Sequence, residues 1–196
     1  TIGRTALADA LVADLSEHLV KIDLGFTGKQ VLLYGAIEGE GNVVVVVQGP
    51  REPITMRRKA RVAGVWANDA SVTFNDAISF YQVMASAELD EWLPFTLRER
   101  HQIGVEYLDF SPREKIGPAE KADFQTALIR SKQNLGHYGM LEGRVSVLGG
   151  RLFRTEIFFP ANVPTGIYNL EAFLVRDGEM ISAQKTPLYV SKSGIE

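Results

Sequence analysis

The sequence contains no cysteine, so neither disulfide bonds nor thiolate chemistry is available to this protein. The absence of cysteine is compatible with a cytosolic protein and with many periplasmic ones, so it leaves the compartment open. The net charge of −3 at pH 7 excludes the strongly basic footprint of a nucleic-acid-binding domain. No stretch of the sequence approaches the roughly 18–20 apolar residues of a membrane-spanning helix.

Metal-binding residues are scarce as well. The only histidines are His18, His101 and His137, and no two of them have short metal-ligand spacing. A zinc site needs about three or four ligands at binding distance. The sequence therefore predicts no metal site and no cofactor. His137 directly follows Gly136 at an expected helix end, where a cation would interact favourably with the helix dipole.

Motifs for catalysis are also missing. The sequence has no Gly-x-Ser-x-Gly nucleophile elbow. The glycine-rich stretch Glu38–Asn42 lacks the lysine and the strand–loop–helix context of a phosphate-binding loop, and it is typical of a hairpin loop. The carboxylates show no motif that places two of them at a productive separation. The sequence therefore indicates no catalytic residue and favours a protein that is not an enzyme.

The strongest structural signal is the uninterrupted valine run from Val43 to Val47. It lies between a glycine-rich loop and Gly49-Pro50, and β-branched runs of this kind favour a strand over a helix. Because the run leaves no face suited to water, it predicts a central strand buried on both faces. A second local signal is Asp177-Gly178, which predicts a two-residue hairpin turn between flanking strands.

The spacing of short strands, roughly 8–12 residues apart, predicts a mainly β fold. We expect an immunoglobulin-like β-sandwich domain over residues 16–85 and a second, helix-containing β-rich domain over residues 86–196. The strands expected in the first domain are 17–24, 30–37, 43–47, 54–60, 62–68, 72–74 and 80–85. The second domain is expected to hold a helical segment (87–136), followed by a β-rich part (138–193) with strands at 141–147, 152–159, 168–175 and 181–190.

Two helices are predicted within the helical segment. The first, over 87–100, is interrupted by Pro94, because proline breaks the helical hydrogen-bond ladder. The second, over 118–135, starts at Pro118, which suits the first helical position, and ends before Gly136. Its buried stripe is expected to contain Phe124, Leu128 and Leu135.

A cluster of basic residues follows the valine strand. If residues 54–60 and the positions just after them form a strand, Arg57, Lys59 and Arg61 project from one face, where they could bind an anion or an acidic partner. Arg58 then points to the other face and needs a carboxylate or carbonyl partner. Trp66 is close enough in sequence to stack on one of the arginines. The alternative is a solvated edge strand whose charges discourage aggregation, with Trp66 in the core.

The amino-terminal stretch has two interpretations. Ala6-Leu7-Ala8 has the small-x-small form of a signal-peptidase site. The same residues also fit an alanine-rich helical lead-in.

Four segments of the sequence resemble an uncharacterised alphaproteobacterial family described as "putative transmembrane protein". The resemblance extends from about Leu11 to Glu196, and it is carried by FTGKQVLLYGA, VVVVVQGPREPITMRRKARVAGVWAN, LFRTEIFFPANVPTGIYNLEAFLVRDG and LYVSKSGIE. It implies a signal peptide, an extracytoplasmic body at the periplasmic face of the inner membrane, and one membrane helix after Glu196. It also implies a membrane transport protein as the partner, and it supplies no catalytic residues.

Three functional hypotheses remain open from the sequence. The first is a non-enzymatic, membrane-anchored periplasmic domain that acts through protein contacts with a membrane or periplasmic partner. The second is a module that binds a small anion or a glycan through Arg57, Lys59, Arg61 and Trp66. A metal-dependent hydrolase ranks last.

Overall fold

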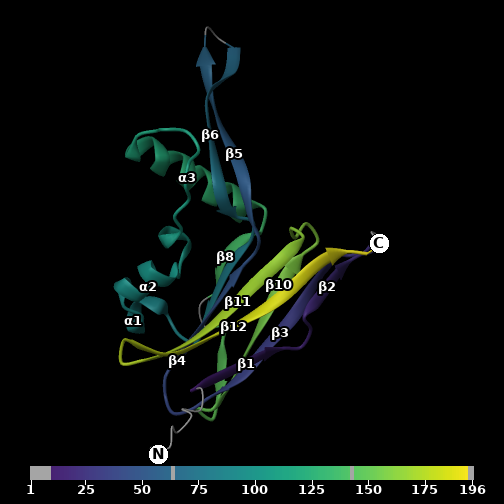
Figure 1. Cartoon of the computed structure of the whole chain (residues 1–196), viewed down its shortest axis with the longest axis vertical. Coiled ribbons are helices and arrows are strands. Elements are labelled where there is room, and N and C mark those ends of the chain that lie inside the picture. Colours follow the sequence, from purple (N-terminus) through teal and green to yellow (C-terminus); the bar gives the residue numbers. More distant parts are fainter. Residues whose placement is uncertain (1–9, 63–64, 142–143, 194–196) are drawn as a thin grey trace, which may run out of the picture.

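The computed structural model describes residues 10–62, 65–141 and 144–193, and these residues form a mainly β fold (Figure 1). The helical segments are α1 (Leu89–Trp92), α2 (Phe95–His101), the short 3₁₀ helix η1 (Val105–Tyr107) and α3 (Pro118–Asn134). The strands are β1 (Leu11–Leu15), β2 (Leu19–Ile22), β3 (Gly28–Ile37), β4 (Asn42–Gln48), β5 (Arg51–Val62), β6 (Val65–Ile78), β7 (Tyr81–Ala85), β8 (Tyr138–Leu141), β9 (Ser146–Leu148), β10 (Leu152–Pro160), β11 (Gly166–Arg176) and β12 (Glu179–Lys192).

Two sheets pack face to face and enclose the first hydrophobic core. One is four-stranded, in the order β1-β3-β10-β9, and the other is six-stranded, in the order β2-β12-β11-β4-β7-β8. The mainly β class predicted from the sequence is confirmed. The immunoglobulin-like detail is not, because β12–β2 and β7–β8 pair in parallel, whereas immunoglobulin sheets are antiparallel.

Both sheets combine strands from distant parts of the chain. In the four-stranded sheet β3 pairs with β10, and in the six-stranded sheet β4 lies between β11 and β7. The stretches 16–85 and 138–193, which the sequence analysis assigned to separate domains, therefore supply neighbouring strands of the same sheets. Neither of the two large sheets is formed by one stretch alone, and the helical segment is an insertion between β7 and β8.

The valine run forms β4 and is buried on both faces, as the sequence predicts. Val43, Val45 and Val47 face the first core, between the two sheets. Val44 and Val46 face a second core on the other side of the six-stranded sheet. All five are at most 1% exposed, and this burial follows from alternate side chains pointing to opposite faces of the strand.

The second core is covered by the helical segment. The expected break at Pro94 separates α1 from α2, and α3 begins at Pro118 as predicted. Phe124 and Leu128 of α3 are buried, but Leu135 is half exposed, so its place in the buried stripe was predicted wrongly. The reason is that Leu135 is the C-terminal cap residue, where the helix is already ending.

The Asp177-Gly178 turn is confirmed. β11 and β12 pair antiparallel up to Arg176 and Glu179, and the two residues between them have φ values of 51° and 76°. Positive φ at both central positions is the requirement of the tight hairpin turn predicted from the Asp-Gly pair.

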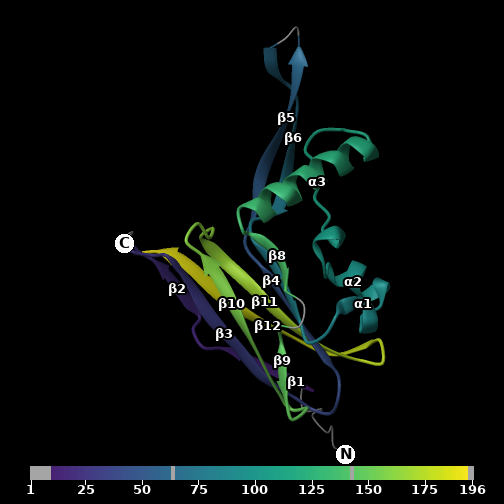
Figure 2. The same ribbon diagram turned by 180° about the vertical axis from the view of Figure 1, so that it is seen from behind.

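Strands β5 and β6 form a long two-stranded hairpin, called the arm here, which extends away from the sandwich (Figures 1 and 2). Its register runs from Arg51 opposite Ile78 to Val62 opposite Val65. The sequence analysis had predicted three separate short strands, over 54–60, 62–68 and 72–74. This prediction was wrong, because β6 does not end at its polar residues. It continues past them, and the ladder forms a bulge at each of these places.

The amino-terminal stretch also needs a correction. Leu11–Leu15 is strand β1, whose alternate residues are buried, so a helical lead-in does not extend into these residues. The signal-peptidase motif Ala6-Leu7-Ala8 lies outside the described residues.

We predict that Val45→Asp prevents folding or lowers the free energy of unfolding by about 4 kcal/mol or more, because it places an unpaired carboxylate between the two sheets. Urea-induced unfolding followed by circular dichroism measures the change. Val45→Ala, which removes volume without adding charge, should cost less than the aspartate. An aspartate variant with the parent's unfolding midpoint would show that β4 is not sealed from water.

Candidate functional site

The candidate site is the arm, where the predicted basic cluster lies. Arg57, Arg58 and Lys59 are all exposed on β5. Arg58 pairs with Ala70 and Lys59 pairs with Asn68, so β6 accommodates one extra residue, Asp69, at this point. Because the extra residue belongs to β6, the alternation along β5 is kept, and a bulge of this kind increases the local twist of the ribbon.

Arg58 lies on the side of the arm that faces α3. Ile54 and Met56, which share its face of β5, pack against the second core. The Arg58 guanidinium lies 5.6 Å from the centre of the Phe124 ring of α3. A cation over an aromatic face is attracted by the ring quadrupole. The sequence analysis predicted a carboxylate or carbonyl partner for Arg58 and did not anticipate this ring.

Arg57 and Lys59 occupy the opposite face of β5 from Arg58. Among the described residues, no carboxylate lies within ion-pair distance of either side chain. The side chains of Arg61 and Trp66 lie outside the described part of the structure. Their backbones do pair directly, Arg61 opposite Trp66, so the stacking of the tryptophan on an arginine stays a prediction.

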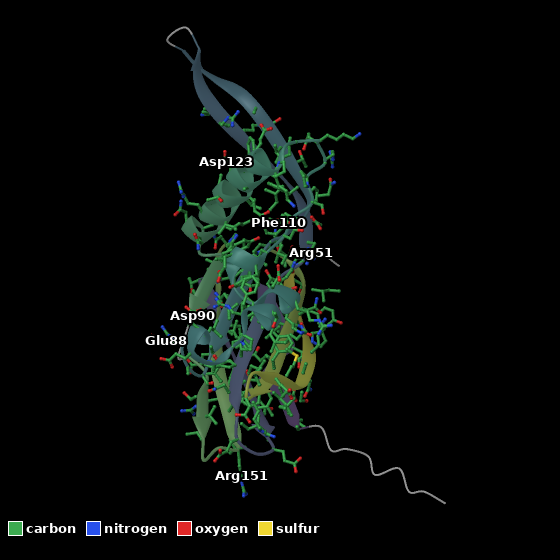
Figure 3. The ribbon with its side chains drawn as sticks, turned by 90° about the vertical axis from the view of Figure 1, so that its left-hand side faces the viewer. Arg51, Glu88, Asp90, Phe110, Asp123 and Arg151 are labelled. Carbon is green, nitrogen blue, oxygen red and sulfur yellow. The ribbon has the colours of Figure 1, made fainter. Side chains whose placement is uncertain are left out.

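A small hollow of about 200 Å³ lies where the arm meets α3. Its apolar lining comes from Met56, Phe124 and Ala127, and its charged lining comes from Arg57, Arg58 and Asp123. Figure 3 marks Asp123 where α3 passes the arm. The hollow is large enough for one side chain or one small group, and its charged lining favours a ligand that carries both apolar and anionic parts.

The foot of the arm is fixed to the body by polar contacts. Arg51, labelled at the foot of the arm in Figure 3, donates to the carbonyl of Asp76 at 3.0 Å. Lys132 of α3 is nearly buried and lies 3.4 Å from the carboxylate of Glu52. Glu114 accepts a hydrogen bond of 2.8 Å from the backbone N–H of Thr73, which lowers the pKa of its carboxyl group. These contacts secure the proximal half of the arm.

A second charged cluster was not found from the sequence. Arg98 is 8% exposed, it pairs with Asp90 and with Glu106 at 2.7 Å, and its guanidinium lies 4.9 Å from the centre of the Tyr107 ring. These residues come from α1, α2 and η1, and the contacts tie those short elements together. The only sequence signal for this cluster was the pair of acidic residues, each eight positions from the arginine. Because Arg98 is nearly buried and paired with two carboxylates, we interpret the cluster as a structural element.

The three histidines are not brought together. His18 lies 3.1 Å from Asp14, and the His101 ring lies 5.2 Å from the Phe173 ring. In the part of the chain that the structure describes, no group of three or more potential metal ligands is placed to hold an ion.

His137 is buried, and it is not the helix-capping cation that the sequence suggested. Its Nε2 lies 3.1 Å from the carbonyl of Asn162, while its Nδ1 is buried without a partner among the described residues. Burial, followed by the charge of Lys132, lowers the pKa of this imidazole. Burial therefore favours the neutral form of the ring.

The comparison with known proteins identifies the family. A family described as "Putative transmembrane protein (Alph_Pro_TM)" matches residues 10–196, and the chain belongs to it. This confirms the resemblance seen in the sequence. No curated protein matches the chain. None of the helices formed by the described residues is long and apolar enough to cross a membrane.

We predict that His137 makes the stability depend on pH. Its folded-state pKa lies below the unfolded value of about 6.5, so the unfolded chain binds the proton more readily. The free energy of unfolding should therefore fall as the pH drops from about 7 through the unfolded pKa towards the folded one. In His137→Gln this decline should be smaller, whereas exposed His18→Gln should keep it. Chemical unfolding at a series of pH values measures the slopes; equal slopes in all three proteins would contradict the assignment.

Proposed function

We propose that this chain is a non-enzymatic, extracytoplasmic domain of a membrane-anchored protein and that it acts through protein contacts made by the arm. The observation that carries the proposal is the arm itself. It extends beyond the sandwich and presents Arg57, Arg58 and Lys59 to solvent, in a protein whose net charge is −3. A local field opposite in sign to the rest of the protein selects acidic partners and steers their approach.

The distal half of the arm has no role in the two described cores. The residues of the arm that pack on the second core lie near its foot: Ile54, Met56, Ala70, Val72, Phe74, Ala77 and Ile78. Beyond them the ribbon has only two strands, with both edges unpaired within the described residues. A two-stranded ribbon is marginally stable in water unless something packs against it. Binding would supply that support, and this favours a contact element over a purely solubilising edge.

The cellular location that we propose rests on the family to which the chain belongs. Membership in a family described as transmembrane supports attachment to a membrane. We propose the periplasmic face of the inner membrane, and we propose an acidic surface of a membrane protein, such as a transporter, as the partner of the arm. Under this proposal the sandwich holds the arm in position, and the arm binds the partner.

A second candidate function rests on the hollow between the arm and α3. Arg58 lies beside the apolar wall formed by Met56 and Phe124, and Arg57 borders the hollow from the next position on β5. Such a site could take a small anion or one acidic unit of a glycan, because guanidinium groups bind oxyanions and apolar surface packs against the carbon skeleton. Arg61 and Trp66, whose backbones pair with each other on the arm, stay predicted members of such a site.

We predict that the triple change Arg57→Glu, Lys59→Glu and Arg61→Glu leaves the melting temperature nearly unchanged. Arg57 and Lys59 are exposed, and exposed charges contribute little to stability. The same change should abolish recovery of partner proteins when the tagged, full-length protein is cross-linked and purified from membranes of its own host. Quantitative mass spectrometry of the recovered proteins measures the loss.

The matched control reverses three exposed cations of the sandwich, Lys21, Arg151 and Lys192, to glutamate. It alters the net charge by the same amount and leaves the arm intact. Proteins lost in the arm variant and kept in the control are specific partners. If the arm variant and the control recover the same proteins as the parent, the arm serves only as a charged edge that prevents aggregation.

A further inference from the structure

Two arginines meet at a second hollow, far along the chain from the arm. The hollow has a volume of about 310 Å³ and lies at the β9–β10 edge of the four-stranded sheet. Figure 2 shows these two strands side by side. It is lined by Leu32, Arg144, Ser146, Arg154, Thr155 and Glu156. We call it the sheet hollow.

The strand register explains why these side chains converge. Arg154 of β10 lies directly opposite Ser146 of β9. Arg144 precedes Ser146 by two residues; both are exposed, whereas Val145 between them is buried in the first core. This alternation puts Arg144, Ser146 and Arg154 on the outer face of the sheet, so two guanidinium groups and a hydroxyl share one surface.

The charges of the sheet hollow are not balanced. Among the described residues, neither Arg144 nor Arg154 has an ion pair or a side-chain hydrogen bond. Glu156 is the single carboxylate in the lining, and its Oε2 accepts a hydrogen bond of 3.3 Å from Gln30. Two cations beside one carboxylate leave a positive hollow, which attracts an anion.

A buried hydroxyl in the same lining also has no partner. Thr155 is 2% exposed, and its Oγ1 is fully buried without a hydrogen-bond partner among the described residues. Buried polar atoms are normally hydrogen-bonded, because leaving one unpaired is unfavourable. Thr155 lies between the exposed residues Arg154 and Glu156 on β10, however, so its side chain points to the inner face of the sheet and its hydroxyl is not one of the donors of the sheet hollow. The donors of the sheet hollow are the two guanidinium groups and the Ser146 hydroxyl on the outer face.

We propose that the sheet hollow binds a small molecule that carries one oxyanion group: a carboxylate, a phosphate or a sulfate. The planar forks of Arg144 and Arg154 match the paired oxygens of such a group, and Ser146 can donate a further hydrogen bond. Leu32 provides an apolar wall for the carbon part of the ligand, and the half-exposed Tyr34 lies opposite Arg154 on β3. The Glu156 carboxylate disfavours ligands with a second negative charge nearby, and it can accept a hydrogen bond from a hydroxyl group of the ligand.

The site is separate from the arm and independent of the function proposed for it. The test uses amide chemical shifts of the isotopically labelled protein during titration with inorganic phosphate, sodium sulfate and sodium glucuronate at constant ionic strength. We expect saturable shifts at Arg144, Ser146, Arg154 and Thr155 with at least one of the three anions. The anion that saturates the chemical-shift changes at the lowest concentration shows whether the site prefers a carboxylate, a phosphate or a sulfate.

Two variants each remove one guanidinium, Arg144→Gln and Arg154→Gln. Each should weaken binding of that anion about tenfold, since a hydrogen bond to a charged group contributes on that scale. Arg151→Gln is the matched control, because Arg151 is an exposed arginine on the turn between β9 and β10, outside the hollow (Figure 3). It should bind as the parent does. Shifts that fail to saturate with all three anions, or equal weakening in the control, would overturn the proposal.

Discussion

The burial of β4 on both faces is the constraint on which the rest of the structure depends. A strand of five valines has no surface that water can solvate, so each face must be covered by other elements. The four-stranded sheet covers one face, and the helical segment with the foot of the arm covers the other. The strand order of the six-stranded sheet meets the same need, because β4 lies inside the sheet and not at its edge. Its neighbours are β11 and β7, although β11 is distant in sequence.

The same strand sets the position of the arm. Gly49 follows β4, and a Cβ atom at that position would come within 2.8 Å of the Ser79 hydroxyl and 2.9 Å of Phe80. Only glycine allows this close approach, which brings the two ends of the arm together at its foot. Gly49 and Pro50 thus connect β4, the most apolar strand, directly to β5, the most cationic strand. The core holds the arm in place without shielding its charges.

Much of this arrangement could be predicted from local patterns. The valine strand, the break at Pro94, the start of α3 at Pro118 and the turn at Asp177-Gly178 each depend on neighbouring residues alone, and the structure confirms them. The mixing of the two halves could not be predicted in this way, because the pairing of β3 with β10 joins residues more than 100 positions apart. Strand pairing over that separation leaves no local pattern in the sequence.

The arm shows the limit most clearly. Polar residues such as Asn68-Asp69 and Asn75-Asp76 favour turns, so the sequence suggested that strands end there. In the structure, the register shifts at both places and β6 passes through them as bulges. The cations of the candidate site were found from composition, but the Phe124 ring beneath Arg58 was not, because α3 and β5 meet only in the folded protein. The sheet hollow was missed for the same reason: Arg144 and Arg154 are ordinary surface residues until β9 pairs with β10.

Hydrogen exchange, measured by mass spectrometry on the full-length protein in its native membranes and on the purified domain, tests the central claim most directly. In both samples the amides of β4 should exchange slowest, because the strand lies between two cores. Amides of residues 57–62 and 65–70 should exchange quickly in the purified domain and become protected in the membranes, where the arm meets its partner. Equal exchange of the arm in both samples would contradict the account.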